Sequence, residues 1–241
     1  MQLPSWIVDS ARYVGSLLLL LLVAALMGIA AIPAWWLVTR VHADWGWVAA
    51  AFSLPFAYAI WGLGYSLLCL AYKRLTFYRA REGEFPFFTW QVLQWAITGR
   101  LTDVANIIFV RHLRGTPYIV WWFRLLGAKI GRRVTIMDPF ISDWDLIEIG
   151  DDAMFGANAS VIGHVGEMGK VKLARVVIGK HCNVGLSAAI FPGVTMGDGS
   201  VLGGFSLAPK GKTIPANQIW GGVPAEFIRE RKGKDFVPPP E

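Results

Sequence analysis

Two long uncharged runs dominate the first third of the chain. Residues 13–39 and 45–72 carry no Asp, Glu, Lys or Arg. A helix needs roughly 20 apolar residues to cross a bilayer, so each run is long enough to span one. Tryptophans flank the short connection between the runs, as interfacial aromatic residues do: Trp35, Trp36, Trp45 and Trp47. The pattern predicts a transmembrane helical hairpin over residues 1–83.

A cleaved secretory signal is the alternative interpretation of the first run. The run is longer than the apolar core of a typical signal, and residues 33–36 make a poor cleavage site, so we expect a retained anchor. The positive charges follow the second run: Lys73, Arg74, Arg79 and Arg81. The positive-inside rule therefore places both termini in the cytoplasm and predicts a bacterial inner (cytoplasmic) membrane location with a cytoplasmic catalytic domain.

The segment 84–127 is dense in apolar residues, but charged residues interrupt it. Arg100, Asp103, Arg111 and Arg114 leave no uncharged run of spanning length. Amphipathic helices lying on the inner leaflet fit this pattern, with arginines at the headgroups. The alternative is that these helices simply pack under the following domain, and the two interpretations can both hold.

An apolar residue recurs every six positions in the second half of the chain, with two breaks: Ile130, Ile136, Ile149, Phe155, Val161, Ile178, Val184, Ile190, Met196 and Leu202. Glycine follows directly at seven of these ten positions. One short strand and one turn per hexad, with three hexads per coil, predict a three-sided parallel β-helix over residues 128–214. Residues 215–241 then form a C-terminal cap and tail.

The two breaks in this register are candidate functional sites. The first contains one extra residue near Asp143 and Asp145. The second follows Val161, where residues 166–175 fit the hexad pattern badly. A loop that leaves a rigid solenoid is a common place for binding and catalytic residues.

Composition and charge narrow the classes of protein. The chain is 54% hydrophobic and only 17% charged, which excludes a disordered chain, a coiled coil and a disulfide-stapled secreted module. The net charge of +6 suits an anionic surface, either lipid headgroups or phosphorylated ligands. We expect no nucleic-acid partner, because most aromatic residues lie in the apolar half and not among basic ones. The overall class is a mixed membrane and β protein.

Several motifs carry a family resemblance: residues 162–164 (Ile-Gly-His) before a loop, residues 190–198, and residues 221–225 (Gly-Gly-Val-Pro-Ala). They resemble the hexapeptide-repeat acyltransferases, whose fold is a left-handed parallel β-helix. Residues 115–117 (Gly-Thr-Pro) and 124–131 resemble more closely the membrane-bound C-terminal region of ε-poly-lysine-synthetase-type proteins. The soluble sugar acetyltransferases usually carry Trp before Ile-Gly in the coil after the His loop, where this chain has residues 182–185 (Cys-Asn-Val-Gly).

The resemblance implies an O- or N-acyltransferase. Its donor would be acetyl-CoA or another acyl-CoA, with no metal, and its sites would lie between the subunits of a homotrimer. The acceptor would be a membrane-associated metabolite, a glycan or a lipid-linked intermediate, and membrane lipid would be a second partner.

Among the four histidines, His164 matches the family's catalytic residue. Histidine is the most frequent general base, and a carboxylate beside it would fix its tautomer, a role that we expect for Glu167. The alternatives are a turn histidine satisfied by backbone and a solvated loop glutamate. His181 occupies the same position in its own hexad, so it would lie one coil above His164 if the loop were not extruded. It is the second candidate base or a wall of the acceptor site, unless it is simply an exposed turn residue.

The remaining candidates follow from the resemblance. Asp143 and Asp145 would bind the acceptor, or else cap their turn. Gly204, Ser206 and Ala208 belong to the stretch whose backbone lines the pantetheine arm in the superfamily. Lys210 and Lys212 would meet the CoA phosphates, or else anionic lipid.

Two other functions compete with acyl transfer. A non-catalytic trimeric scaffold, or a processing subunit of a larger synthase, would show no thioester turnover. A γ-class carbonic-anhydrase-like enzyme would need three histidines at a metal, and the solenoid offers only His164 and His181.

Overall fold

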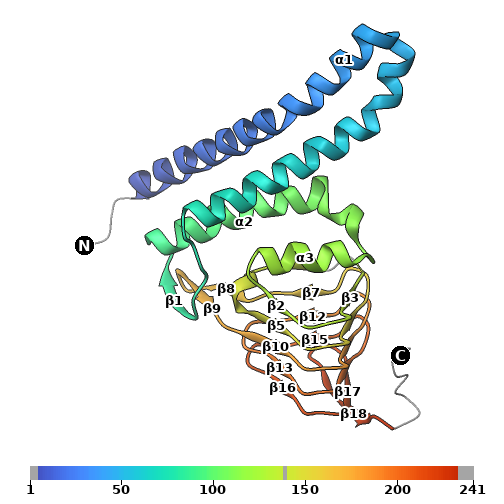
Figure 1. The fold of residues 1–241 in the computed structure, drawn as a ribbon. Coiled ribbons are helices and arrows are strands. Elements are labelled where there is room, and N and C mark those ends of the chain that lie inside the picture. Colours follow the sequence, from blue (N-terminus) through green and yellow to red (C-terminus); the bar gives the residue numbers. More distant parts are fainter. Residues whose placement is uncertain (1–4, 138–139, 233–241) are drawn as a thin grey trace. The chain divides into compact units, whose positions relative to one another are not determined.

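The computed structural model describes residues 5–137 and 140–232 (Figure 1). The chain forms two compact units, which are described separately below. The first comprises residues 1–75 with 100–109, and the second comprises residues 76–99 with 110–241. The boundary between the units therefore passes twice through the segment 84–127, for which the sequence predicts one interfacial layer.

The first unit is built on α1 (Ser5–Leu75), a single helical element where the sequence predicts two helices with a connection. Only Gly46 departs from helical backbone, with φ 81° and ψ −179°, and the helix turns back on itself there (Figure 1). Glycine adopts this conformation at little cost, so one residue suffices for the reversal. The two arms of α1 contact each other, because Trp61 Nε1 donates to the Met27 carbonyl at 3.0 Å.

The surface of α1 is largely apolar. Among the described residues, Tyr13–Leu75 is the one helix that is long and apolar enough to cross a membrane, and 17% of its most apolar stretch is buried inside the protein. The second part of α2 (Trp90–Ile108) belongs to this unit. Tyr65 Oη of α1 donates to the Leu101 carbonyl of α2 at 3.3 Å.

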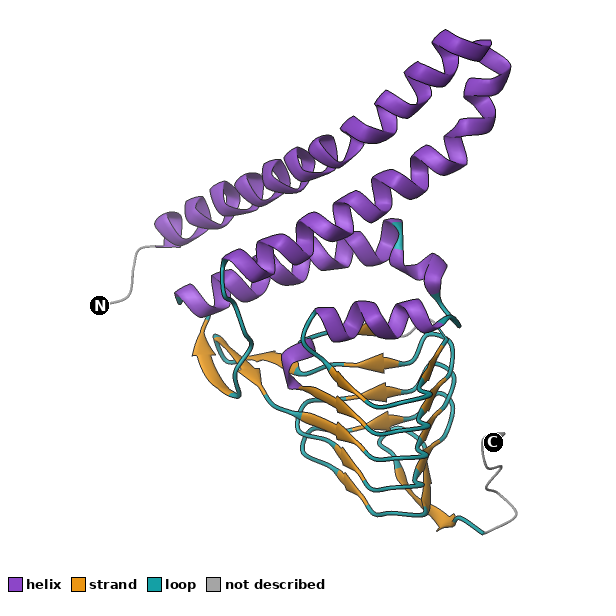
Figure 2. Ribbon diagram, in the orientation of Figure 1, coloured by secondary structure: helices purple, strands orange, loops and turns teal. Residues whose placement is uncertain are grey.

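The second unit is a three-sided parallel β-helix, as the hexad period predicts (Figure 2). Its first face contains β2 (Lys129–Ile130), β5 (Ile147–Ile149), β10 (Val176–Ile178), β13 (Thr195–Met196) and β16 (Thr213–Ile214). Its second face contains β3 (Thr135–Ile136), β6 (Met154–Phe155), β11 (Asn183–Val184), β14 (Val201–Leu202), β17 (Gln218–Gly221) and the antiparallel β18 (Glu226–Glu230). Its third face contains β4 (Phe140–Ile141), β7 (Ser160–Val161), β12 (Ala189–Ile190) and β15 (Leu207–Ala208).

All ten predicted hexad positions are buried, between 0% and 9% exposed. Each inward side chain stacks on its counterpart one coil away, as Val161 does on Ile190. The glycines after these positions have a steric reason. A Cβ on Gly150 would lie 2.6 Å from the backbone nitrogen of Lys180 in the next coil, so only glycine lets the coils approach this closely.

The three corners of this prism are named by the faces that they join. Corner A joins the first face to the second and includes residues 131–134, 150–153 and 179–182. Corner B joins the second face to the third. Corner C joins the third face back to the first and includes residues 142–146, 162–175, 191–194 and 209–212.

Both breaks in the hexad register lie at corner C. The first contains the short helix η2 (Trp144–Leu146). The second, predicted to be an irregular loop, is a β-hairpin of β8 (His164–Glu167) and β9 (Lys170–Leu173). This hairpin pairs with β1 (Gly83–Pro86) in an antiparallel sheet, so a segment from before the β-helix extends its corner.

The remaining elements close the two ends of the β-helix. After η1 (Val110–Leu113), α3 (Pro117–Leu125) contacts β2 and β3 of the first coil, and it buries Ile119, Trp122 and Phe123. At the other end β18 pairs with β17, within the segment predicted to be a cap. Residues 233–241 of that segment lie outside the described residues.

Candidate active site

Corner C brings together most of the residues that the sequence singles out. Asp143 and Asp145 lie at its first coil, His164 and Glu167 at its second, and Lys210 in the segment just after β15 of the fourth. These residues are far apart in sequence, and the coil repeat stacks them along one edge.

A buried carboxylate holds the imidazole of His164. Asp143 Oδ2 lies 2.6 Å from His164 Nδ1, and the same oxygen accepts from Ser142 Oγ and from the backbone N–H of Gly163. The Asp143 side chain is only 2% exposed, so these hydrogen bonds replace the water that it has lost. A side chain on Gly163 would collide with Asp143, because its Cβ would lie 2.8 Å from that of Asp143.

Trp95 completes the shell around this carboxylate. Its Nε1 donates to Asp143 Oδ1 at 2.7 Å, and its ring meets the His164 ring edge-on with centroids 4.8 Å apart. Trp95 comes from α2, which precedes the β-helix. No local sequence pattern links Trp95 to a corner 48 residues further along the chain, so the sequence by itself predicts no role for it.

This arrangement fixes the chemistry of the imidazole. With the Nδ1 proton donated to Asp143, the lone pair of His164 lies on Nε2. Nε2 makes no hydrogen bond to the described residues, and the side chain is 28% exposed. The pair is therefore suited to general-base catalysis, with the carboxylate holding the tautomer and stabilising the imidazolium.

Glu167, expected beside His164, has different partners. It forms ion pairs with Lys210 and, at 4.0 Å, with Lys172, and the Lys210 ammonium holds the pKa of its carboxyl below the ordinary range. His164 and Glu167 are the two ends of β8, and three residues of extended chain separate them by about 10 Å. The carboxylate that contacts His164 is therefore Asp143 and not Glu167.

Asp145, expected to bind the acceptor, contacts the chain itself. Its Oδ2 accepts from the backbone N–H of Ala80 at 3.0 Å. The extended segment 78–81, which follows α1, is thereby held against corner C.

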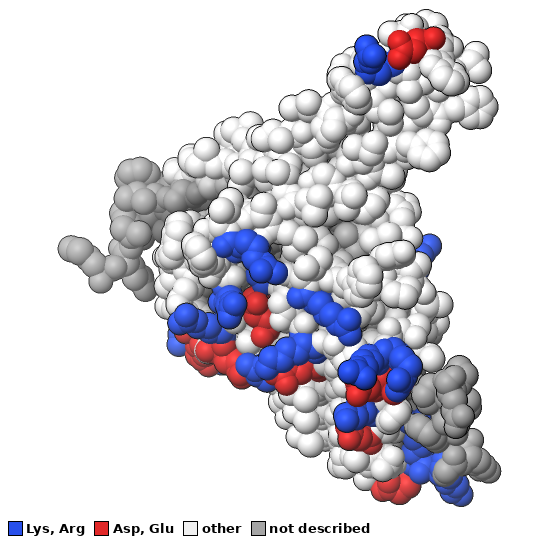
Figure 3. All heavy atoms as spheres, in the orientation of Figure 1, with Lys and Arg blue, Asp and Glu red and all other residues white. Residues whose placement is uncertain are grey.

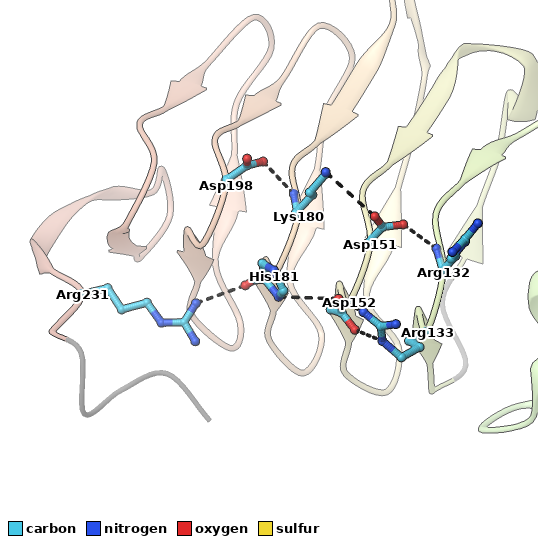
Figure 4. A network of polar contacts seen from close by, with 8 residues as sticks. All are labelled: Arg132, Arg133, Asp151, Asp152, Lys180, His181, Asp198 and Arg231. Atoms are coloured by element: carbon cyan, nitrogen blue, oxygen red, sulfur yellow. Dashed lines mark hydrogen bonds and ion pairs between the residues drawn. The ribbon is translucent and has the colours of Figure 1, made fainter. Parts of the chain in front are cut away.

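His181 lies at corner A, so it does not stack above His164 as one alternative had it (Figure 4). The hairpin leaves the β-helix between Val161 on the third face and Ile178 on the first face. Ile178 therefore lies on the next face after Val161 and not one full coil above it, so His181 and His164 lie at different corners. His181 Nδ1 lies 3.7 Å from Asp152 Oδ2. Asp152 in turn pairs with Arg133, in a network of charged residues that runs along this corner (Figure 4).

The predicted cofactor residues of the fourth coil offer mainly backbone. Ser206 and Ala208 are 3% and 0% exposed, so their side chains face the core, whereas Gly204 is exposed. Ser206 Oγ accepts from the Gly222 N–H at 3.0 Å. The Lys212 ammonium lies 4.4 Å from the centre of the Trp220 ring, and Lys210 is paired with Glu167. Within residues 5–137 and 140–232, no group of three or more His, Cys, Asp or Glu is placed to hold a metal ion.

The three-sided β-helix built from hexads is the fold of the hexapeptide-repeat acyltransferases. The family model described as the hexapeptide repeat of succinyl-transferase matches residues 147–166 and 175–204, and the gap between the two matches contains β9 of the hairpin. The putative colanic acid biosynthesis acetyltransferase WcaF of Escherichia coli is 34% identical over 135 residues, which cover 45% of this chain and 72% of that protein. The chain belongs to the hexapeptide-repeat acyltransferase family, so it is an acyltransferase and its β-helix is left-handed, as expected.

Two further similarities extend the comparison. The delta-poly-L-ornithine synthetase of Acinetobacter baumannii is 31% identical over 174 residues, which cover 72% of this chain but only 13% of that much longer protein. A hexapeptide-repeat acetyltransferase from Vibrio cholerae, solved in complex with acetyl coenzyme A, has a TM-score of 0.45 and 15% identity, covering 61% of this chain and 93% of that one.

Proposed function

We propose that this protein is a membrane-anchored acyltransferase. It moves an acetyl or longer acyl group from acyl-CoA to a hydroxyl or amine of a membrane-associated metabolite, glycan or lipid-linked acceptor. The observation that carries the proposal is the 2.6 Å contact between His164 Nδ1 and the buried Asp143 carboxylate, which leaves Nε2 as the base.

The reaction uses His164 twice. Nε2 removes the proton from the acceptor O–H or N–H while the acceptor oxygen or nitrogen attacks the thioester carbonyl. The tetrahedral intermediate collapses, the carbon–sulfur bond breaks, and the imidazolium returns its proton to the departing CoA thiolate. Asp143 stabilises the imidazolium between these steps, and backbone N–H groups are the candidate donors to the oxyanion.

Direct transfer is favoured over a covalent acyl-enzyme. Cys182 is buried, and burial raises the pKa of its thiol, so the nucleophilic thiolate is disfavoured. Its Sγ already donates to the Gly197 carbonyl at 3.1 Å.

We assign the donor to the backbone near Gly204 and to Lys212. Lys210 reaches the donor phosphates only by leaving Glu167. Glu167 acts in this scheme by pairing with Lys210 and so holding the hairpin to the fourth coil, and not by orienting the imidazole of His164.

Membrane anchoring is supported by the surface of α1. Large apolar side chains along both of its arms are exposed, among them Leu18, Ile32, Phe52 and Phe56. On the face drawn in Figure 3 this helix is almost uncharged except near its bend, where Arg40 and Asp44 pair. Basic residues follow at its end, so the catalytic unit lies on the cytoplasmic side of the inner membrane.

A homotrimer with sites between subunits is supported by exposed apolar side chains on the second face of the β-helix and at corner B: Met137, Met154, Leu186 and Phe205. Apolar residues gathered on one side of a rigid prism mark a contact surface, and closed cyclic symmetry is the usual way to cover it.

The test is a donor screen on the full-length protein in detergent, with free CoA as the readout and a panel of amine and hydroxyl acceptors. Wild type should release CoA in an acceptor-dependent way, and His164→Ala should lose about 10²- to 10⁴-fold in rate. His181→Ala, at corner A, is the matched control and should retain turnover. Absence of turnover with every donor would favour the non-catalytic scaffold or processing subunit.

A further inference from the structure

A pocket lined in part by Trp95 lies beside the His164–Asp143 pair. Its volume is about 180 Å³, and it is lined by residues of the segment 77–81, of β1, of the start of α2 and of strand β9. Trp95 lines this pocket and also contacts both Asp143 and His164, so one side chain forms a wall of the pocket and a support of the catalytic pair.

The pocket combines an apolar floor with a cationic rim. Val92, Val171 and Leu173 form the floor and belong to a buried cluster. Arg79 and Arg81, both exposed, also line the pocket, and no acidic residue does.

These two arginines differ from the other cations of the same surface. Arg175 pairs with Glu82 and Glu148, Lys170 and Lys172 pair with Glu84, and Lys210 pairs with Glu167. Arg79 and Arg81 make no ion pair or side-chain hydrogen bond within the described residues, and both are exposed. Two unpaired guanidinium groups that face one pocket make a site for a bidentate anion such as a phosphate.

The chain holds these arginines in place. They flank Ala80, whose N–H donates to Asp145 at corner C. In an extended segment alternate residues point to the same side, so fixing Ala80 presents Arg79 and Arg81 together. The corner that orients His164 through Asp143 therefore also orients the two arginines through Asp145.

We propose that this pocket binds a phosphate ester carried on an apolar chain, with the phosphate on Arg79 and Arg81 and the first carbons on the apolar floor. A pocket of this size is smaller than the roughly 300–1,000 Å³ of a site that encloses a whole small molecule, so it takes one end of a longer ligand. Arg79 lies four residues beyond the end of α1 at Leu75, so the chain keeps it within about 14 Å of that end. If α1 spans the bilayer, this short connection keeps Arg79 within reach of the headgroups. That the acceptor of acyl transfer uses this pocket rests on the proposed function, whereas binding of a phosphate ester to the pocket does not.

Binding is measured by titration calorimetry on the full-length protein in dodecyl maltoside, a detergent without phosphate. Hexyl phosphate is the probe, and hexanol is its neutral counterpart. Hexyl phosphate should bind more tightly than hexanol, and Arg79→Gln and Arg81→Gln should each weaken it by about tenfold or more, as expected for hydrogen bonds to a charged group. Arg132→Gln, which removes an exposed arginine at corner A, is the matched control and should bind as wild type does.

The phosphate could belong to a phosphorylated acceptor or to a lipid headgroup. Repeating the titration in phosphatidylcholine nanodiscs with and without phosphatidylglycerol distinguishes these two sources. Unchanged hexyl phosphate affinity assigns the pocket to a phosphorylated acceptor, and competition by phosphatidylglycerol assigns it to a lipid headgroup. Either result supports a phosphate-ester site.

Equal binding of hexyl phosphate to wild type and to the Arg79→Gln/Arg81→Gln variant would overturn the proposal. Weaker binding of acyl-CoA with unchanged binding of hexyl phosphate would also overturn it, because the arginines would then serve the donor. Failure of the proposed acyl transfer gives a different result: wild type and His164→Ala would release CoA at the same rate, or neither would release it.

Discussion

The carboxylate of Asp143 is the most informative place to perturb the proposed mechanism. Asparagine has the same shape but no charge. Three donors meet at Oδ2 of Asp143, from Ser142, Gly163 and His164, and one donor, from Trp95, meets Oδ1. An asparagine oxygen should take the Oδ2 position, because the opposite orientation would set its amide against three donors. The tautomer of His164 is then preserved, and at the imidazole the variant changes only the charge.

The structure sets the size of the effect. A carboxylate and an imidazolium with charge centres about 4 Å apart interact by about 4 kcal/mol at the effective dielectric constant of a protein surface. Asp143→Asn should therefore lower kcat/KM by about 10²- to 10³-fold. The same change turns the amide N–H₂ toward Trp95 Nε1, two donors 2.7 Å apart, and should cost about 1–3 kcal/mol of unfolding free energy.

Adding Trp95→Phe separates these two effects, because it removes the opposing donor. The double variant Asp143→Asn/Trp95→Phe should recover part of the stability that Asp143→Asn loses and none of its rate. Thermal unfolding and acceptor-dependent CoA release, measured on the same preparations, report the two quantities. If Asp143→Asn keeps more than about a tenth of the wild-type kcat/KM, the carboxylate does not stabilise an imidazolium and the mechanism is wrong.

Four further predictions follow from the fold. Val161 is fully buried in the ladder of the third face, so Val161→Ala should lower the free energy of unfolding by roughly 1–3 kcal/mol and leave kcat/KM unchanged. A loss of activity without a loss of stability would contradict its structural role. Lys210 lowers the pKa of Glu167, so this pair stabilises the fold above the ordinary glutamate pKa of about 4.5, and the stabilisation is lost as the pH falls through the lowered pKa. Glu167→Gln should therefore make thermal unfolding less sensitive to acid. An identical pH profile of wild type and variant would refute the pairing. A C-terminal alkaline phosphatase fusion should be inactive, because both termini are expected in the cytoplasm, and periplasmic activity would reverse the topology. The detergent-corrected mass of active protein should be that of three protomers, and an active monomer would exclude sites between subunits.

The sequence alone determined the architecture of the second unit and its candidate base. The six-residue period decides which side chains point inward, and this local rule holds at every position from Ile130 to Leu202. The uncharged runs likewise show where the chain is apolar enough to span a bilayer. His164 stands out because it falls at a break in the period, where the chain leaves the solenoid.

The tertiary structure alone decided the partners of that base. Asp143 reaches His164 across one coil, and Trp95 reaches both from a helix that precedes the β-helix. The six-residue period predicts that a residue lies at a corner of the β-helix. Which of the three corners it occupies depends on how many residues each break extrudes, so His181 lies at corner A although its hexad position matches that of His164. Likewise Glu167, three residues from His164, points to Lys210 because those residues form a strand rather than a turn. Spacing in the sequence predicts direction only within one regular element, and contacts between elements depend on how the breaks fold.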